Sequence, residues 1–408
     1  MSGRNVPIRP EDRLSRAVSG IKPSAIRRFF DLANEMRGQV ISLSIGEPDF
    51  VTPWPISEQG IYSLEQGRTH YSANTGMIEL RQAISAYMKN RFDLSYNARE
   101  EIVVTVGGSE AIDAAVRALV NPGDEVLIPE PSFVAYQACV RLAGAVPVPI
   151  PLSPETDFRL TAEQLEAAIT KKTRLLVMAY PNNPTGAVLE DSDLKALAAV
   201  LERYPEVAVL SDELYAELTY PPAVFRSIAS YPGMWERTVV IGGFSKAFAM
   251  TGWRIGYALG PAPIIAAMNK IHQYVIMCAP TTAQYAAIAA LEDAETFIAP
   301  MRSEYNRRRR LLLHGLRQLE LPCFEPLGAF YAFPDIRSTG LGSGEFCERL
   351  LQEEYVAVIP GGAFGSCGEG FIRISYAAAL ENIEEALRRI ARFIGKPAPD
   401  LTRPAADA

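Results

Sequence analysis

The stretch GGFSKAFAMTGWRIGY, residues 242–257, is the most informative part of the chain. It places two cations, Lys246 and Arg254, in a segment that is otherwise apolar, rich in glycine and free of other charge. A buried ammonium group is costly unless it is deprotonated or paired, so Lys246 is a candidate for an amine of lowered pKa that can form a Schiff base. Arg254 offers a planar fork of donors that suits phosphate.

A reactive amine beside a phosphate clamp suggests pyridoxal 5'-phosphate as cofactor. Isolated lysines and arginines are more often surface residues whose alkyl stems lie over apolar neighbours. The cofactor interpretation therefore needs further groups elsewhere in the chain, namely a partner for the pyridine ring and a second phosphate contact.

Two apolar runs, 175–179 and 207–210, are typical of buried strands and lead directly into polar groups. The second leads to Asp212 and Tyr215, and the first to Asn183 in a turn with two prolines and a glycine. Open α/β sheets bind ligands at the carboxyl ends of their strands. There a carboxylate could keep a pyridine nitrogen protonated, and the other two side chains could reach the ring oxygen. Taken alone, Asp212 is more often a helix N-cap, and the residues around Asn183 are more often a plain Asn-Pro turn.

A third strand-like run, 102–106, leads into Gly107-Gly108-Ser109-Glu110 and a helix that continues to Leu119. Glycines ahead of a helix leave backbone N–H groups free to hold phosphate. One such turn is common in α/β proteins, but here it stands in the chain order that a phosphate site needs.

Together these motifs resemble the class I and II aminotransferases of the pyridoxal-phosphate fold-type I superfamily, over about residues 21–393, and residues 245–256 are the most specific part. The resemblance implies that Lys246 carries the cofactor and serves as catalytic base, that Asp212 pairs with the pyridine nitrogen, and that Tyr215 assists catalysis. It implies that the other cofactor-binding residues are Asn183 at the ring oxygen, Phe133 on the ring face, and Gly108, Ser109, Glu110, Ser245 and Arg254 at the phosphate side.

The resemblance extends to the substrate and to a second subunit. Arg373, in residues 371–376, matches the family's α-carboxylate arginine, and Asn183 and Gly46 are implied to contact substrate as well. Tyr71, in residues 70–76, matches a tyrosine that reaches the partner subunit's phosphate, which implies a homodimer.

Two positions depart from the family pattern. Gly243 stands three residues before the lysine, where relatives often carry Ser or Thr, so Ser245 becomes the more important phosphate hydroxyl. Ser109 stands where some aspartate-using relatives carry a lysine. We therefore expect a neutral or aromatic amino donor, such as alanine or phenylalanine, rather than aspartate.

The expected function is ping-pong transfer of an amino group from an α-amino acid to a 2-oxo acid such as 2-oxoglutarate. Two alternatives stay open. The same site could run β-elimination as a carbon–sulfur lyase, because one carbanion serves both reactions. The chain could also be a non-catalytic cofactor-binding regulator, because fold does not fix function, although residues 1–21 are too short for the DNA-binding segment fused to such regulators.

The composition fits an enzyme that acts on small molecules. The chain has 408 residues, 48% of them hydrophobic, and a net charge of -7, which gives no reason to expect nucleic acid. We expect the one basic block, residues 307–310, to be a solvated helix face. Five scattered cysteines without a Cys-x-x-Cys pair indicate free thiols, a reducing cytoplasmic location and no metal site. No apolar stretch approaches the ~18 residues of a membrane span.

The predicted fold class is α/β. Strands ending near residues 106, 128, 179, 210 and 241 alternate with helical patterns, which favours a mostly parallel sheet of about seven strands in an α/β/α sandwich, with a smaller α/β domain. The expected boundaries are a disordered arm at 1–13, the N-terminal part of the small domain at 14–49, the large cofactor-binding domain at 50–291, the rest of the small domain at 292–395 and a disordered tail at 396–408.

Overall fold

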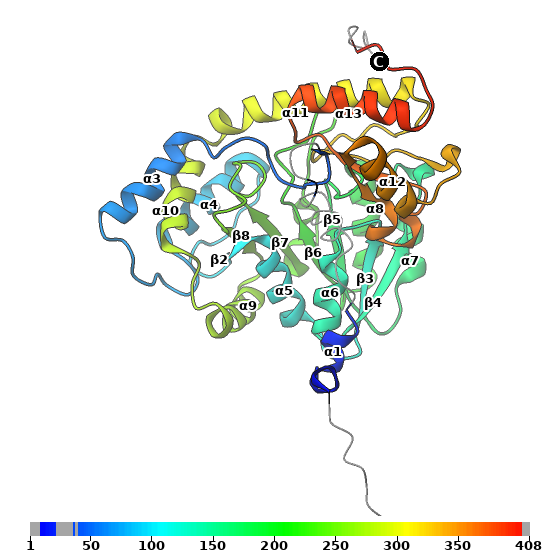
Figure 1. Cartoon of the computed structure of the whole chain (residues 1–408). Coiled ribbons are helices and arrows are strands. Elements are labelled where there is room, and N and C mark those ends of the chain that lie inside the picture. Colours follow the sequence, from blue (N-terminus) through cyan, green and yellow to red (C-terminus); the bar gives the residue numbers. More distant parts are fainter. Residues whose placement is uncertain (1–8, 22–35, 37–39, 402–408) are drawn as a thin grey trace, which may run out of the picture.

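A seven-stranded sheet forms the centre of the protein (Figure 1), which is seen here in a computed structural model that describes residues 9–21, 36 and 40–401. The strand order is β2-β8-β7-β6-β5-β3-β4. Strand β8 runs antiparallel to its neighbours β7 and β2, and the other pairs are parallel, which confirms the predicted sheet. The strands are β2 (Ile102–Thr105), β3 (Glu125–Glu130), β4 (Val146–Pro151), β5 (Thr173–Ala179), β6 (Ala208–Asp212), β7 (Thr238–Gly243) and β8 (Gly256–Leu259).

Helices cover both faces of this sheet because its strands are apolar on both sides. In β3, Val126 and Ile128 pack in one core cluster with residues of α5, α6 and α9, whereas Leu127 between them packs in another with residues of α7 and α8. The covering helices are α5 (Gly107–Leu119), α6 (Ala135–Leu142) and α9 (Ala262–Val275) on one side, and α4 (Ile78–Phe92), α7 (Ala162–Ala168), α8 (Asp191–Glu202) and α10 (Thr281–Glu292) on the other.

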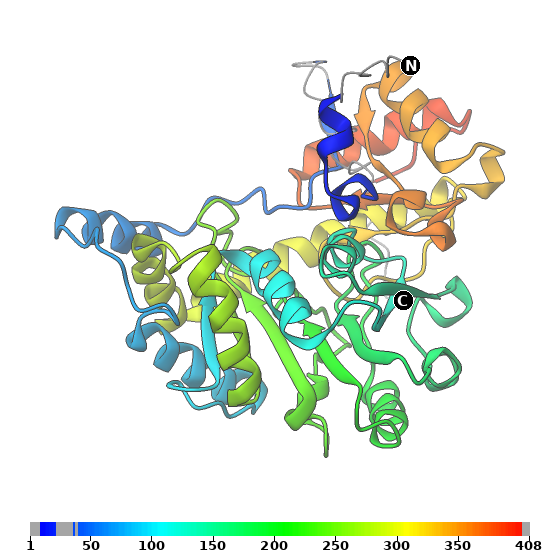
Figure 2. The same cartoon turned by 90° about the horizontal axis from the view of Figure 1, so that it is seen from below.

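The C-terminal elements form a second, smaller group, coloured yellow to red in Figure 2. Strand β1 (Ile41–Ser42) pairs in parallel with β10, so this part of the N-terminal segment lies among them. The short helix α1 (Arg16–Ser19) instead lies beside α6. The domain boundaries themselves remain a prediction. The group comprises α11 (Ala294–Gln318), β9 (Tyr331–Ala332), α12 (Ser343–Glu354), β10 (Val356–Ala357), β11 (Ile359–Pro360), β12 (Ile372–Ser375) and α13 (Leu380–Phe393).

Parts of both predicted disordered arms have defined structure. Residues Pro10–Arg13 form a 3-10 turn. Near the other end, Lys396 pairs with Glu320, and the Asp400 N–H donates to Gln318 at 2.7 Å, because the end of α11 offers polar partners there. The remaining arm residues, 1–8 and 402–408, lie outside the described residues, as do 22–35 and 37–39.

The basic block 307–310 is not a uniformly solvated helix face. Arg308 and Arg309 are 6% and 3% exposed, and they bind Asp49 and Glu325 at 2.8 and 2.7 Å. Successive helical residues are rotated by about 100°, so four in a row cannot all face solvent. Among the helices in the described ranges, none has the length and apolarity needed to cross a membrane.

Candidate active site

The predicted site residues meet at one edge of the large sheet. Asp212 is the last residue of β6 and lies in register with Ala179 at the end of β5 and Ile241 in β7. Lys246 follows the end of β7 by three residues. Because β8 runs in the opposite direction, its start lies at the same edge, which brings in Arg254 two residues before Gly256.

A cavity of about 440 Å³ opens at this edge. Its walls come from strand ends of the large sheet, from the segment after β1 and from the small antiparallel sheet β11-β12-β9. The predicted site residues that line it are Gly46, Gly108, Ser109, Phe133, Asn183, Asp212, Tyr215, Ser245, Lys246, Arg254 and Arg373.

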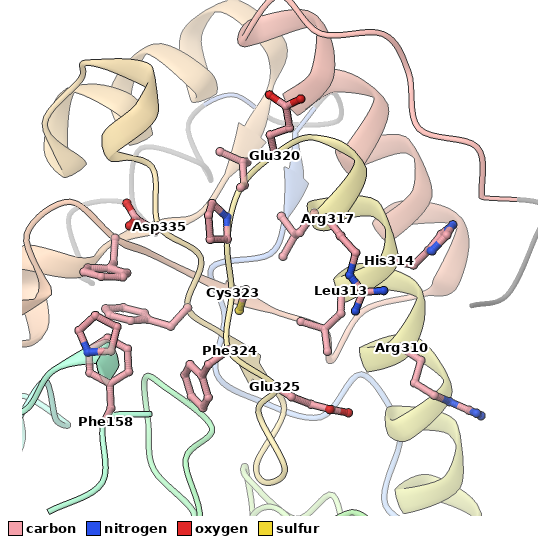
Figure 3. Close-up of a pocket in the computed structure, with 16 residues that line it drawn as sticks. Phe158, Arg310, Leu313, His314, Arg317, Glu320, Cys323, Phe324, Glu325 and Asp335 are labelled. Carbon is pink, nitrogen blue, oxygen red and sulfur yellow. The ribbon is translucent and has the colours of Figure 1, made fainter. Parts of the chain in front are cut away.

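A second cavity, of about 640 Å³, is larger but carries none of these residues. Figure 3 shows that it lies beside α11, which contributes Arg310, His314 and Arg317, and the loop that follows through Cys323 and Phe324. Size therefore does not identify the site. The chemistry of the lining residues selects the smaller cavity.

Lys246 has the features of a reactive amine. Its Nζ donates to the Gly46 carbonyl oxygen at 2.6 Å and lies 5.8 Å from the ring centroids of Tyr215 and Phe330. Burial lowers the pKa of Lys246 to about 8, against the opposing effect of the nearby Glu47 carboxylate. An amine of this pKa is partly neutral near pH 7, as a nucleophile or proton acceptor must be.

Gly46 allows Tyr331 to lie close to this backbone segment because it has no side chain. A Cβ at this position would stand 2.5 Å from the hydroxyl oxygen of Tyr331. The Tyr331 hydroxyl in turn shares a hydrogen bond of 2.7 Å with the hydroxyl of Tyr215. The sequence did not single out Tyr331, although it belongs to a run of apolar and aromatic residues between two turns.

Asp212 is buried and has no ion-pair partner among the described residues. Its Oδ2 accepts from Tyr136 Oη at 2.7 Å, and its Oδ1 accepts from the Leu214 N–H at 3.2 Å. Burial raises the pKa of Asp212, and these hydrogen bonds oppose that effect. A protonated pyridine nitrogen would supply the missing cation, so this carboxylate fits the expected cofactor.

The first turn of α5 and Arg254 form the side of the cavity that suits phosphate. Gly107 has φ +74°, and a Cβ there would lie 2.7 Å from Nη2 of Arg254, so glycine lets the guanidinium approach the helix N-terminus. Arg254 is held by its Nη1, which donates to the Thr251 carbonyl oxygen at 3.0 Å. Free N–H groups, a guanidinium and the Ser245 hydroxyl together match the needs of a phosphate.

The position of Leu214 explains why glycine, rather than serine or threonine, stands at residue 243. A Cβ at Gly243 would lie 2.8 Å from Leu214 Cδ2, and one at Gly108 would lie 2.6 Å from Leu214 Cδ1. The leucine therefore occupies the space that a serine or threonine would need. In the sequence, the position of Leu214 between Asp212 and Tyr215 indicated that it lies near the site. The direction of its side chain is seen only in the fold.

Arg373 is a buried guanidinium without a carboxylate partner among the described residues. Its Nη1 donates to Asn183 Oδ1 at 3.0 Å, and its Nη2 donates to the Ser44 carbonyl oxygen at 2.6 Å. Its Nε is buried and finds no partner within residues 9–21, 36 and 40–401. The group lies 4.6 and 5.0 Å from the ring centroids of Tyr331 and Phe364. An unsatisfied buried donor on a cation points to an anionic ligand.

Two predicted residues do not line the cavity. The Glu110 carboxylate turns away from it: one oxygen accepts from the Val106 N–H and the other lies against the His272 ring nitrogen, each at 2.5 Å. Only its backbone N–H belongs to the turn that faces the cavity. The Tyr71 side chain is 79% exposed at the surface.

Tyr136, which contacts both Asp212 and Phe133, was not predicted from the sequence. Tyr136 follows Phe133 by three residues, and the two rings make an edge-to-face contact with centroids 5.7 Å apart. The spacing of one helical turn was a signal that Tyr136 would point the same way.

Comparisons with known proteins agree with this geometry. The sequence model of the family described as Aminotransferase class I and II matches residues 38–390. YugH of Bacillus subtilis, whose name states an aminotransferase without a substrate, is 54% identical over 94% of this chain and 98% of its own. An aspartate aminotransferase of Pyrococcus abyssi is 45% identical over 93% of this chain and 98% of its own.

A solved structure extends the likeness to three dimensions. The crystal structure of an aromatic aminotransferase from Pyrococcus horikoshii OT3 matches with a TM-score of 0.86 and 45% identity, over 90% of this chain and 98% of that one. Because the family match spans most of the sequence and the cavity suits the cofactor, the chain belongs to the class I and II aminotransferases, which are pyridoxal-phosphate-dependent enzymes of fold type I.

Proposed function

We propose that this enzyme transfers the amino group of a neutral or aromatic α-amino acid to a 2-oxo acid such as 2-oxoglutarate by a ping-pong mechanism. The observation that carries the proposal is the presence of three unusual groups around one cavity. They are the amine of lowered pKa at Lys246, the buried carboxylate of Asp212 and the incompletely satisfied guanidinium of Arg373.

Lys246 is proposed as the cofactor anchor and the catalytic base. When bound, pyridoxal phosphate supplies an electron sink for the negative charge left on the substrate α-carbon. The freed ε-amine of Lys246 takes the proton from that carbon, and its lowered pKa suits this task near neutral pH.

Asp212 is proposed to keep the pyridine nitrogen protonated. The hydroxyl of Tyr136 and the N–H of Leu214 hold the carboxylate in one orientation before the reaction begins. Such preorganised charge in a buried site costs no rearrangement when charge develops in the substrate. Asn183 and Tyr215, which both line the cavity, are proposed to contact the ring oxygen.

Arg373 is proposed to bind the substrate α-carboxylate with its guanidinium, which belongs to a residue of the cavity lining. The rings of Tyr331 and Phe364 on its faces and the Asn183 amide oxygen fix the guanidinium plane. A fixed plane orients the substrate, so the α-carbon is held near Lys246.

The charges in the cavity support a donor without a second carboxylate. The described lining residues that carry positive charge are Lys246, Arg254 and Arg373, and each already has a proposed partner. Glu47 adds a negative charge to the same wall. A side-chain carboxylate would find no free cation in this part of the lining, which the sequence departure at Ser109 also indicates.

Names of relatives do not decide the donor, because proteins named for aspartate and for aromatic substrates are equally similar at 45% identity. The second carboxylate of 2-oxoglutarate meets the same shortage of cations. The acceptor is therefore tested separately: turnover with pyruvate but not with 2-oxoglutarate would replace 2-oxoglutarate in the proposal, and turnover with 2-oxoglutarate would overturn the charge argument.

We further propose that the active unit is a homodimer in which Tyr71 reaches the partner's phosphate. Large apolar side chains are exposed together around α3 (Trp54–Glu65), which packs on α10, and around the connection between α9 and α10. Asn74 Nδ2 donates to the Met277 carbonyl oxygen at 2.8 Å and so ties the segment after Tyr71 to that connection. The exposed residues are Val51, Trp54, Ile61, Tyr62, Leu64, Tyr71, Tyr274, Val275 and Met277. A monomer in sedimentation equilibrium at micromolar concentration would contradict the dimer.

A cytoplasmic location is proposed because all five cysteines are free thiols in the structure. Fractionation of the source cells tests it. Recovery of the protein outside the cytoplasmic fraction would contradict the proposal.

The function is tested by adding single amino acids to the cofactor-loaded enzyme without any acceptor acid. We expect the visible absorption band to fade with phenylalanine or alanine and to persist with aspartate. Equal fading with aspartate would overturn the donor proposal. Pyruvate released from a cysteine conjugate, with the band unchanged by amino acids, would identify a carbon–sulfur lyase instead.

A further inference from the structure

Glu110 and His272 form a buried pair just outside the cavity. Glu110 stands in the first turn of α5, and His272 stands in the last turn of α9 and is 1% exposed. Glu110 Oε1 lies 2.5 Å from His272 Nδ1. Because a carboxylate can only accept, Nδ1 carries the proton, and the other ring nitrogen, Nε2, is buried with no hydrogen-bond partner in the part of the chain that the structure describes.

The Glu110 carboxylate holds the turn that precedes the helix. Its second oxygen, Oε2, accepts from the N–H of Val106, which is the N-cap residue and has no side-chain cap of its own. Gly107 follows with φ +74°. The carboxylate thus holds this turn, while Gly108 and Ser109, which follow it, line the cavity.

His272 connects the pair to the segment that carries Tyr71. Its carbonyl oxygen accepts from Ile276 and Met277 N–H groups at 2.8 and 3.0 Å, which ends α9 and begins the connection to α10. The Met277 carbonyl oxygen then accepts from Asn74. One chain of contacts therefore runs from the phosphate-binding turn to the surface around Tyr71.

We propose that Glu110 and His272 are positioning residues that set the phosphate-binding turn of α5 and link it to the Tyr71 segment. The proposal rests on the proposed function only in placing the cofactor phosphate at this turn. Neither side chain lines the cavity, so both act through the backbone of residues 106–109.

The test measures how tightly apoprotein variants bind pyridoxal phosphate and pyridoxal, which lacks the phosphate. For His272→Leu and Glu110→Gln, we expect the Kd for pyridoxal phosphate to rise about tenfold to a hundredfold, the equivalent of one charge-assisted hydrogen bond. The Kd for pyridoxal should stay unchanged, because that ligand does not use the turn. His272→Asn, which can still donate to Glu110, should restore most of the affinity.

Asp113→Asn is the matched control, since it removes one negative charge from the same helix and breaks only the pair with Arg117 at 2.8 Å. It should leave both Kd values unchanged. Equal weakening of both ligands by His272→Leu, or no weakening by Glu110→Gln, would overturn the proposal. If His272→Leu does not fold, the Asn and Gln variants decide. A wild-type apoprotein that binds the two ligands equally would instead refute the phosphate site itself.

Discussion

The Tyr136 hydroxyl donates to Oδ2 of Asp212 at 2.7 Å, and both side chains are buried at the end of β6. Burial raises the pKa of Asp212, whereas the Tyr136 hydrogen bond, the Leu214 N–H and the charge of Lys246 lower it. The Tyr136 hydroxyl therefore favours the charged form of this carboxylate. Tyr136 is as much a part of the proposed pyridine contact as Asp212 itself.

Asp212→Ala should lower kcat by about a hundredfold to a thousandfold, the scale of losing one major preorganised electrostatic group. Asp212→Asn is the control for shape, and it should be nearly as slow because it keeps the volume but not the charge. Steady-state kinetics with saturating cofactor measure both. A kcat within threefold of wild type for either variant would refute the role.

Tyr136→Phe should shift the acidic limb of the kcat profile to higher pH. The hydrogen bond favours the charged form of Asp212, so its removal raises the pKa of that carboxyl further, and the charged form is then lost at a higher pH as the solution is acidified. The measurement is kcat from pH 5 to 9 for both proteins. An unshifted limb would show that the Tyr136 hydroxyl does not tune Asp212.

Lys246→Ala should abolish turnover, because one residue supplies both the covalent anchor and the base. A variant that retained a tenth of wild-type kcat would refute the assignment.

In wild-type apoprotein, burial lowers the pKa of Lys246 to about 8, so the rate of covalent capture of pyridoxal phosphate should rise with pH to a midpoint near 8. A midpoint near the ordinary lysine value of 10.5 would contradict the burial argument.

The sequence predicted the sheet and the edge at which the site lies because each functional group follows an apolar strand directly. Asp212, Asn183 and the turn at Gly108 could be placed from strand ends alone, since parallel strands end at one edge. Strand β8 was not predicted. Its reversed direction is what brings Arg254 to that edge, and no local pattern in four buried residues distinguishes a parallel from an antiparallel strand.

The missed residues are those whose contacts join distant parts of the chain. Tyr331 reaches Tyr215, 116 positions away, and Tyr136 reaches Asp212, 76 positions away. A tyrosine is most often simply part of the core, so the sequence offered no reason to choose Tyr331 and only the spacing from Phe133 as a reason to choose Tyr136. The direction of the Glu110 side chain could not be predicted for the converse reason, because the position of a residue in the turn does not fix where its carboxylate points.

Arg373→Lys should raise KM for the amino donor more than it lowers kcat. A lysine keeps the charge but loses the planar donors that contact Asn183 and Ser44, and losing such charge-assisted bonds costs about 1.5–3 kcal/mol, or roughly tenfold to a hundredfold in kcat/KM. An amine without an α-carboxylate serves as the control substrate and should react equally with both proteins. An equal loss with that amine would show that Arg373 acts on structure rather than on the carboxylate.

Arg308→Ala should destabilise the protein by about 2–3 kcal/mol, on the scale of a buried charge-assisted contact with its packing. Arg308 binds both oxygens of Asp49 at 2.8 and 2.9 Å and lies 5.2 Å from the Phe50 ring centroid, so it holds the segment that also carries Gly46. Arg307→Ala is the matched control, because Arg307 is exposed and its ion pair with Glu304 lies at the surface, and it should cost less than about 1 kcal/mol.

Urea unfolding of the two apoproteins measures that difference, and the same pair of variants tests a consequence for the site. The Gly46 carbonyl oxygen accepts from Lys246 at 2.6 Å, so loosening its segment should also lower kcat/KM in Arg308→Ala and not in Arg307→Ala. A large loss of stability with unchanged kcat/KM would mean that Asp49 anchors the fold without shaping the cavity wall. Equal stability of the two variants would mean that the buried pair adds nothing beyond a surface one.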